Sequence, residues 1–428
     1  MPAKLHSFAP GPFPTRSTRR TDVTKSACWI VLLALFPGSA ALAQSLPDDR
    51  AESRREYAVV PLAGGDTDIG FGFGALGSVA ELAPGVEPFV WRLEGTAFVT
   101  WKSDDGGITS PYQDVFLLLT VTGLWNGRAR LELRPSFTRE TNQRYYGLGN
   151  ASQAPEEDLA SRDFFTRTHP AMVARLRIAI KGPLHVVVGT LYTHSLIDYE
   201  PTSNLARDLA SPDPTVQDIL LVDTNHGLHF LEIGLVYDSR EDEIAPTGGQ
   251  WHELRLRVSP WGVGFVPYRY LQVTLQARRY QRLGTDRLVL AGRLIADVQM
   301  GDVPFYELSR YAEASALGGA NGVRGVPGDR YHGKRKLFGN LELRTELWDF
   351  RLGKSRYALG LTGFFDAGRL WADATSTPEL DGTGIGLKWG AGAGLRLRKG
   401  QTFVLRADLA YSPDARPVGF YFLAGHLF

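Results

Sequence analysis

The sequence is almost free of cysteine. Cys28 is the only one among 428 residues, and it lies in an N-terminal segment that we expect to be removed. A mature chain without cysteine has no disulfide framework and no thiol chemistry. An excess of charge is also missing, because 47 basic and 46 acidic residues give a net charge of +1. This balance does not indicate a nucleic-acid partner.

Long hydrophobic runs are missing as well. The apolar run from Cys28 to Phe36 is far shorter than the ~20 residues of a membrane-spanning helix. It follows a basic region and precedes Ala41-Leu42-Ala43, which has the small-residue pattern of a signal-peptide cleavage site. We therefore predict a signal peptide at 1–43 rather than a membrane anchor, followed by a short periplasmic segment at 44–55.

The motifs of common active sites are absent. No Gly-x-Ser-x-Gly elbow occurs, and the glycine-rich stretch 70–74 lacks the strand-to-helix context of a nucleotide fingerprint. The histidines are scattered, and His226 with His229 has no third metal ligand nearby in sequence. The sequence predicts no enzyme, no cofactor and no metal site.

Period-two alternation is what the sequence does contain. In 89–101 the odd positions are mainly apolar and aromatic, whereas the even positions include Arg92, Glu94, Thr96 and Thr100. The same alternation recurs in 127–138, 288–300 and 402–411, as expected for strands with two different faces. One face is too charged for a sandwich core and the other too apolar for water. A closed transmembrane barrel with a wet interior satisfies both.

Strand counting predicts an all-β fold, a 16-stranded antiparallel transmembrane barrel that occupies 56–428. Short connections alternate with long inserts, of which 301–337 is the longest and forms the sixth outer loop. The expected strands are 56–62, 69–80, 89–101, 112–124, 127–139, 168–180, 184–197, 227–239, 249–259, 266–280, 286–300, 338–350, 357–370, 384–399, 401–412 and 418–428.

The sixth outer loop contains an unusual glycine-rich segment, Gly318 to Gly328, with Arg324 in its middle. Its Val323-Arg324-Gly325-Val326 resembles a motif of the bacterial surface antigen family, the superfamily of the BamA and TamA assembly factors. Phe364-Phe365-Asp366 is similar to another motif of that family. Further similar segments are Tyr145 to Asn150, Asp238 to Arg240, Pro246 to Gly249 and the last two strands. The sequence departs at Val326, where the family usually has Phe or Tyr.

The resemblance implies that this loop folds back into the barrel and that its arginine docks on the inner wall. Gly322 and Gly325 lie close to Arg324 on either side. Because a buried charge needs a partner, we expect Arg324 to pair with Asp366, which shares a face with Phe364, and with Glu342, or else Glu346. The alternative is a solvated arginine on a mobile outer loop.

The C-terminal segment is aromatic. Phe420, Phe422 and Phe428 share one parity and would lie on one face of a last strand that begins near Gly419. A last strand that ends on Phe resembles the assembly signal of outer-membrane barrels. A core strand of a secreted β protein is the alternative.

Family members that insert or export proteins usually have periplasmic POTRA domains before the barrel. Only about a dozen residues separate the expected cleavage site from the first strand, so we expect a barrel without POTRA domains. The resemblance implies protein insertion or translocation through a weak seam between a short first strand, Tyr57 to Leu62, and the last strand.

The expected surroundings are the lipids of the bacterial outer membrane, with unfolded outer-membrane protein clients or a separate periplasmic accessory protein as partners. The alternative function is a passive pore or a structural surface-antigen barrel without assembly activity. An outer-membrane hydrolase is a third hypothesis, for which the sequence contains no catalytic constellation.

Overall fold

The computed structural model describes residues 53–428 with small gaps, at 67–69, 105–106, 154–162, 261–266, 313, 354, 376 and 415–417. The expected signal peptide at 1–43 lies outside the described residues, as do residues 44–52.

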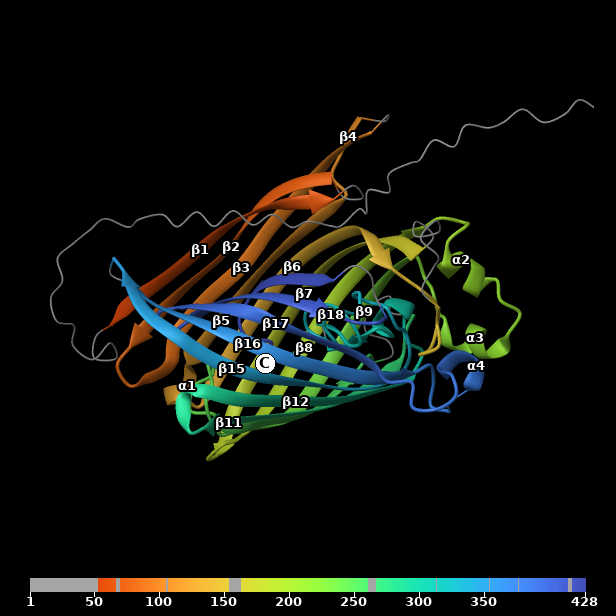
Figure 1. The fold of residues 1–428 in the computed structure, drawn as a ribbon. Helices are drawn as coiled ribbons and strands as arrows, with labels where there is room; N and C mark the ends of the chain where they lie inside the picture. The colour runs from red at the N-terminus through yellow and green to blue at the C-terminus, as the bar shows by residue number, and fades with distance from the viewer. Residues whose placement is uncertain are drawn as a thin grey trace, which may run out of the picture.

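The described chain forms one long antiparallel sheet that curls around an interior (Figure 1). Each long strand pairs with the next long strand along the chain, from β1 to β19. The strands are β1 Arg54–Asp66, β2 Gly70–Ala83, β3 Val86–Asp104, β4 Gly107–Thr109, β5 Tyr112–Gly123, β6 Ala129–Arg144, β7 Phe164–Lys181, β8 Leu184–Tyr199, β9 Asn225–Asp238, β10 Gly249–Val258, β11 Tyr270–Leu283, β12 Thr285–Gly301, β15 Arg335–Leu352, β16 Ser355–Trp371, β17 Lys388–Lys399, β18 Phe403–Tyr411 and β19 Gly419–Ala424.

A small hairpin and a few short helices complete the fold. Its strands are β13 Arg310–Tyr311 and β14 Ala314–Ser315. The helices are α1 Leu124–Gly127, α2 Asn204–Leu209, α3 Pro214–Ile219, α4 Pro378–Asp381 and the 3-10 turn η2 Phe305–Glu307. None of the helices in the described residues has the length and the apolar character needed to cross a membrane.

Every strand expected from the sequence overlaps a strand of the structure. The sheet itself has seventeen strands in the described part of the chain, because the three-residue β4 pairs with the end of β3. No backbone pairing between β1 and β19 is found among the described residues. A closed barrel of sixteen strands therefore remains a proposal.

The connections at the two ends of the sheet differ in length. At one end they are tight: Trp125 and Asn126 turn with φ values of 51° and 58°, and Gly284 alone separates β11 from β12. At the other end lie α2, α3 and α4 (Figure 1), together with the described parts of the long connections 145–163, 200–224, 302–334 and 372–387. This arrangement matches the sorting of short and long inserts expected from the sequence.

The two faces of the sheet have opposite chemistry. On β12 the outward Leu294 is 55% exposed, whereas the inward Asp297 is fully buried. On β15 the outward Leu341 is 48% exposed and the inward Glu342 is fully buried. Apolar side chains outside and charged side chains inside are the reverse of a water-soluble protein, and they suit a barrel in lipid.

The two terminal strands differ from the expectation. The first strand was expected to be short, but β1 spans thirteen residues. The last strand was expected to reach Phe428, but β19 has only six residues and ends at Ala424. The break follows from Gly425, whose φ of +83° turns the chain out of the strand direction.

Candidate functional site

The connection 302–334 folds back inside the curled sheet. Val323 and Val326 at its tip are fully buried. They belong to one apolar cluster with Ile295 of β12 and Phe338 of β15. The tip therefore packs on the inner wall. Val326 is enclosed in this cluster.

Arg324 sits in the middle of this tip and is fully buried. Its guanidinium makes a two-pronged contact with Asp366 of β16, with Nε donating at 2.7 Å and Nη2 at 3.0 Å. The backbone N–H of Arg324 donates to the same carboxylate at 3.1 Å. Nη1 donates to Glu342 of β15 at 2.7 Å and to Asp408 of β18 at 3.0 Å. The guanidinium carbon of Arg324 lies 3.5 Å from the centre of the Phe364 ring, which adds a cation–π contact.

Three further arginines surround these carboxylates. Arg344 contacts Glu342 at 2.8 Å, and Arg396 forms ion pairs with both Asp408 and Glu342. Arg406 lies 3.9 Å from Asp408. Burial alone would lower the pKa of Arg324, but the hydrogen bonds to Asp366 and the charge of Glu342 raise it above its usual value. Arg324 therefore keeps its charge inside the protein.

The walls also hold the backbone of the loop tip. Arg293 of β12 donates to the carbonyl oxygen of Asn321 at 2.6 Å, and Asn340 of β15 donates to that of Gly322 at 2.8 Å. On the opposite side, Arg406 donates to the carbonyl oxygen of Ala320 at 3.0 Å. The tip thus forms hydrogen bonds with β12, β15 and β18.

Glycine allows this close approach. Gly325 has a φ of +93°, and a Cβ there would lie 2.8 Å from the carbonyl carbon of Tyr411. On the wall itself, a Cβ at Gly390 of β17 would lie 1.8 Å from the carbonyl oxygen of Arg324. Any side chain at Gly390 would therefore collide with a backbone atom that cannot rotate away.

The structure brings together most of the residues expected at this site. Arg324 contacts Asp366, Glu342 and Phe364, but it has no bond to Glu346. Glu346 instead accepts from Arg398 at 2.8 Å, because it lies four positions along β15 from Glu342, on the order of 13 Å away.

Two direct hydrogen-bond partners of Arg324 and Gly325 were not expected from the sequence. Asp408 is the third acceptor of Arg324, and the hydroxyl of Tyr421 on β19 accepts from the N–H of Gly325 at 2.9 Å. Strand alternation already placed Asp408 on the inner face. Tyr421 has the opposite parity to Phe420 and Phe422, so the same pattern could have identified it.

Phe420 and Phe422 share one face of β19, as expected, but Phe428 does not share it. Phe420 is 39% exposed on the outer side of β19, and Gly419 pairs with Ala410 of β18. Phe422 packs against an apolar cluster that includes Val60 of β1. The expectation for Phe428 is wrong, because this residue lies beyond the strand and is only 6% exposed.

The last four residues, Gly425 to Phe428, form a tail that turns into the interior. Phe428 packs with Tyr280 of β11 in an apolar cluster that also includes Leu427. The guanidinium carbons of Arg293 and Arg344 lie 5.2 and 4.9 Å from the centre of its ring. Arg344 also donates to the main-chain oxygen of Phe428 at 2.9 Å. Arg293 thus contacts both the tail and the loop tip.

His226 and His229, the two histidines considered as a metal pair, each contact a neighbouring side chain. His226 contacts the hydroxyl of Tyr306 at 2.7 Å, and His229 contacts Thr190 at 2.8 Å. Among the described residues, no group of three or more potential ligands is arranged to hold a metal ion.

Comparisons with known proteins agree with this geometry. The family model described as the Omp85 superfamily domain matches residues 127–428. BamA from Haemophilus ducreyi lacking POTRA domains 1-3 is similar in structure, with a TM-score of 0.50 and 16% identity over 88% of this chain and 70% of that chain. CdiB from Escherichia coli has a TM-score of 0.51 and 15% identity over 92% of this chain and 67% of that chain. At these identities the likeness concerns the fold. No curated protein matches the sequence.

Proposed function

The chain belongs to the Omp85 superfamily, and from this premise we propose that it is an outer-membrane barrel that inserts proteins into the outer membrane or moves them across it. The proposed route is the seam between β1 and β19. The proposal includes no catalytic step and no cofactor.

The observation that carries this proposal is the mismatch of the two strands at the seam. β1 has thirteen residues and β19 has six. Even if the two strands paired fully, more than half of β1 would have no residue of β19 opposite it. Tyr57 and Val59 of β1 are 58% and 72% exposed. A strand edge without a backbone partner is a template for another strand, and an incoming client strand would add to it by backbone hydrogen bonds.

Side chains bridge the seam where backbone pairing is missing. Ala58 and Val60 of β1 share an apolar cluster with Phe403 and Leu405 of β18. Glu56 of β1 accepts from the hydroxyl of Thr402 at 2.9 Å and from the N–H of Gln401 at 3.1 Å. A few side-chain contacts of this kind break more easily than a ladder of backbone hydrogen bonds, which supports a seam that opens.

The alternative function is a passive pore or a structural surface barrel. The loop tip and the tail occupy the interior between β12, β15, β17 and β18, and this filling disfavours a wide aqueous channel. We further propose that the partners are unfolded outer-membrane protein clients or a separate periplasmic accessory protein.

Depletion of the protein tests the proposed function. We expect the amounts of other outer-membrane barrels or of exported proteins to fall, measured by quantitative proteomics of isolated outer membranes. Unchanged client levels together with altered solute uptake would support the pore instead.

A linked seam provides a sharper version of the same test. Cys28, the single cysteine of the sequence, lies in the proposed signal peptide, so Ala58→Cys with Leu405→Cys can be joined by a short bismaleimide. The linked protein is expected to fail to rescue depletion, whereas each single variant treated with the same reagent rescues it. Full rescue by the linked protein would overturn the seam mechanism.

A further inference from the structure

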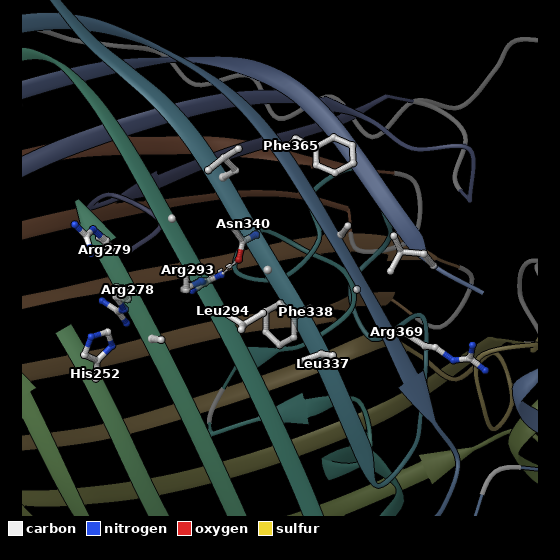
Figure 2. A pocket seen from close by; sticks show the side chains of 17 residues that line it. His252, Arg278, Arg279, Arg293, Leu294, Leu337, Phe338, Asn340, Phe365 and Arg369 are labelled. Carbon is white, nitrogen blue, oxygen red and sulfur yellow. Dashed lines mark hydrogen bonds between the residues drawn. The ribbon is translucent and has the colours of Figure 1, made fainter. Parts of the chain in front are cut away.

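The outer wall has a groove across β11, β12, β15 and β16 that the proposed function does not use. Its volume is about 590 Å³. Figure 2 shows it with His252 and Arg279 towards one end and Phe365 and Arg369 towards the other. Its apolar walls are exposed, since Leu294, Leu341 and Phe365 are 55%, 48% and 48% accessible.

Small residues form the floor of the groove. They are Ala277, Gly292, Gly339 and Ala367, one from each of the four strands. In the cross-strand register Gly292 lies between Arg279 and Leu341. A Cβ at Gly292 would meet only the side chain of Leu341, at 3.9 Å. The depression is therefore open space that the neighbouring side chains do not fill.

The groove rises obliquely from one end of the sheet. Arg279 is four residues from the end of β11 at Leu283, whereas Phe365 is ten residues from the start of β16 at Ser355. Both of these strand ends lie at the side with the tight turns. Three strand spacings separate β11 from β16, on the order of 14 Å. In the proposed membrane, a groove with this course would begin near the surface and run into the hydrocarbon layer.

The two arginines at the ends of the groove differ in their hydrogen-bond partners. Arg369 donates to the carbonyl oxygens of Gly384 and Ile385 in the following loop. Arg279 is exposed on the outer face, and no hydrogen bond or ion pair to it is found among the described residues. An unpaired arginine on a lipid-facing wall is unfavourable, and an anionic oxygen would relieve this cost.

Two polar side chains extend the surface around Arg279. Gln250 of β10 is its direct cross-strand partner, and His252 is the partner of the neighbouring Ala277. The Nε2 atom of His252 lies 3.2 Å from the side-chain oxygen of Gln250. Hydrogen-bonding groups thus lie at the end of the groove near Arg279, and apolar side chains line the remainder.

We propose that this groove binds one glycerophospholipid, with the lipid phosphate on Arg279 and His252 and one acyl chain along the glycine-lined floor. The inference rests on the proposed residence in a membrane. It does not require insertion activity, so a barrel without client activity could still bind the lipid.

Native mass spectrometry of the detergent-purified full chain tests the site, with phosphatidylglycerol as the probe. We expect one retained lipid per protein. Arg279→Gln removes the charge and Gly292→Leu fills the floor, and each is expected to weaken retention at least tenfold. The matched controls are Arg287→Gln, whose exposed arginine pairs with Asp349, and Gly363→Leu, where an added Cβ meets nothing within 4 Å.

Further probes identify what is recognised. Diacylglycerol with the same acyl chains is expected to bind at least tenfold more weakly, and inorganic phosphate is expected not to displace the lipid. Equal retention by Arg279→Gln, Gly292→Leu and the wild type would overturn the proposal, as would an equal loss in all four variants. A dimer that both groove variants abolish would assign the groove to a second copy and would also overturn it.

Discussion

At the scale of single residues, Arg324 shows how a fully buried charge is made acceptable. Asp366, Glu342 and Asp408 supply three carboxylates to one guanidinium. Removing one member of a buried ion pair leaves the others uncompensated, which typically costs ~3–5 kcal/mol. Arginine suits this position better than lysine, because its planar group donates in several fixed directions.

Arg324→Ala is expected to release the loop tip from the wall. The expected loss of docking free energy is ~3–5 kcal/mol, because Asp366 loses its ion-pair partner, whereas Glu342 keeps Arg344 and Arg396. Chymotrypsin should then cut the connection 302–334 at least tenfold faster, and heat-modifiability on gels should fall. The control is Arg287→Ala, which removes only an exposed ion pair. Unchanged protease resistance in Arg324→Ala would contradict the assigned role of Arg324.

Asp163 gives a pH dependence at the end of the sheet with the long connections. It precedes β7 and accepts from Asn204 of α2 at 2.5 Å. Burial raises its pKa to about 6, although Arg144 and Arg330 act in the opposite direction. A raised carboxyl pKa means that the folded arrangement disfavours the charged form. This penalty is fully present above pH 6 and disappears below about pH 4, where the residue is protonated in both states.

Docking of α2 is therefore expected to strengthen as the pH falls from 7.5 to 5. Hydrogen exchange of the α2 amides, corrected for the intrinsic exchange rate, should show several-fold greater protection at pH 5. Because Asn does not titrate, Asp163→Asn should lose the part of this pH dependence that Asp163 causes. A pH dependence of equal size in wild type and variant would assign the effect to other groups.

At the scale of elements, the backbone of the loop tip packs directly against the backbone of β17. Gly390 faces the carbonyl oxygen of Arg324 without any space for a side chain. Such a contact depends on the absence of a Cβ, so it adds steric selectivity to the ion pairs. The same wall contains Gly363 of β16, which faces outwards and has no neighbour within 4 Å of an added Cβ.

Gly390→Val is expected to prevent docking of the tip even though Arg324 and its carboxylates are all present. The expected result is loop cleavage by chymotrypsin at a rate similar to that of Arg324→Ala. Gly363→Val is the matched control, since it adds the same side chain to a strand without entering the loop contact. Resistance of Gly390→Val equal to that of this control would show that the tip does not approach the wall so closely.

At the scale of the whole molecule, period-two alternation was enough to predict the sheet and its two faces. It placed Glu342 and Asp366 on the inner side, whereas the docking of Arg324 on that side was implied by the family resemblance. Alternation does not specify how far along a strand a loop inserts, so it left Glu342 and Glu346 as competing partners. Only the depth of the loop tip decides between them.

The chain ends were the part that the sequence predicted poorly. The aromatic parity of Phe420, Phe422 and Phe428 indicated one continuous strand, but Gly425 breaks it and the tail binds Arg293 and Arg344. That contact depends on residues more than 80 positions away along the chain. Local periodicity contains no information about such a partner, so the inward turn was not predictable from the strand pattern.

The inward tail has a practical consequence for anyone who handles this protein. Residues added after Phe428 would start inside the molecule, beside Arg293, Arg344 and Tyr280. An affinity tag or a fluorescent fusion at the C-terminus would have to displace the tail or thread past the loop tip to reach the outside. The exposed stretch 383–387, just before β17, is the better place for an epitope or a purification tag.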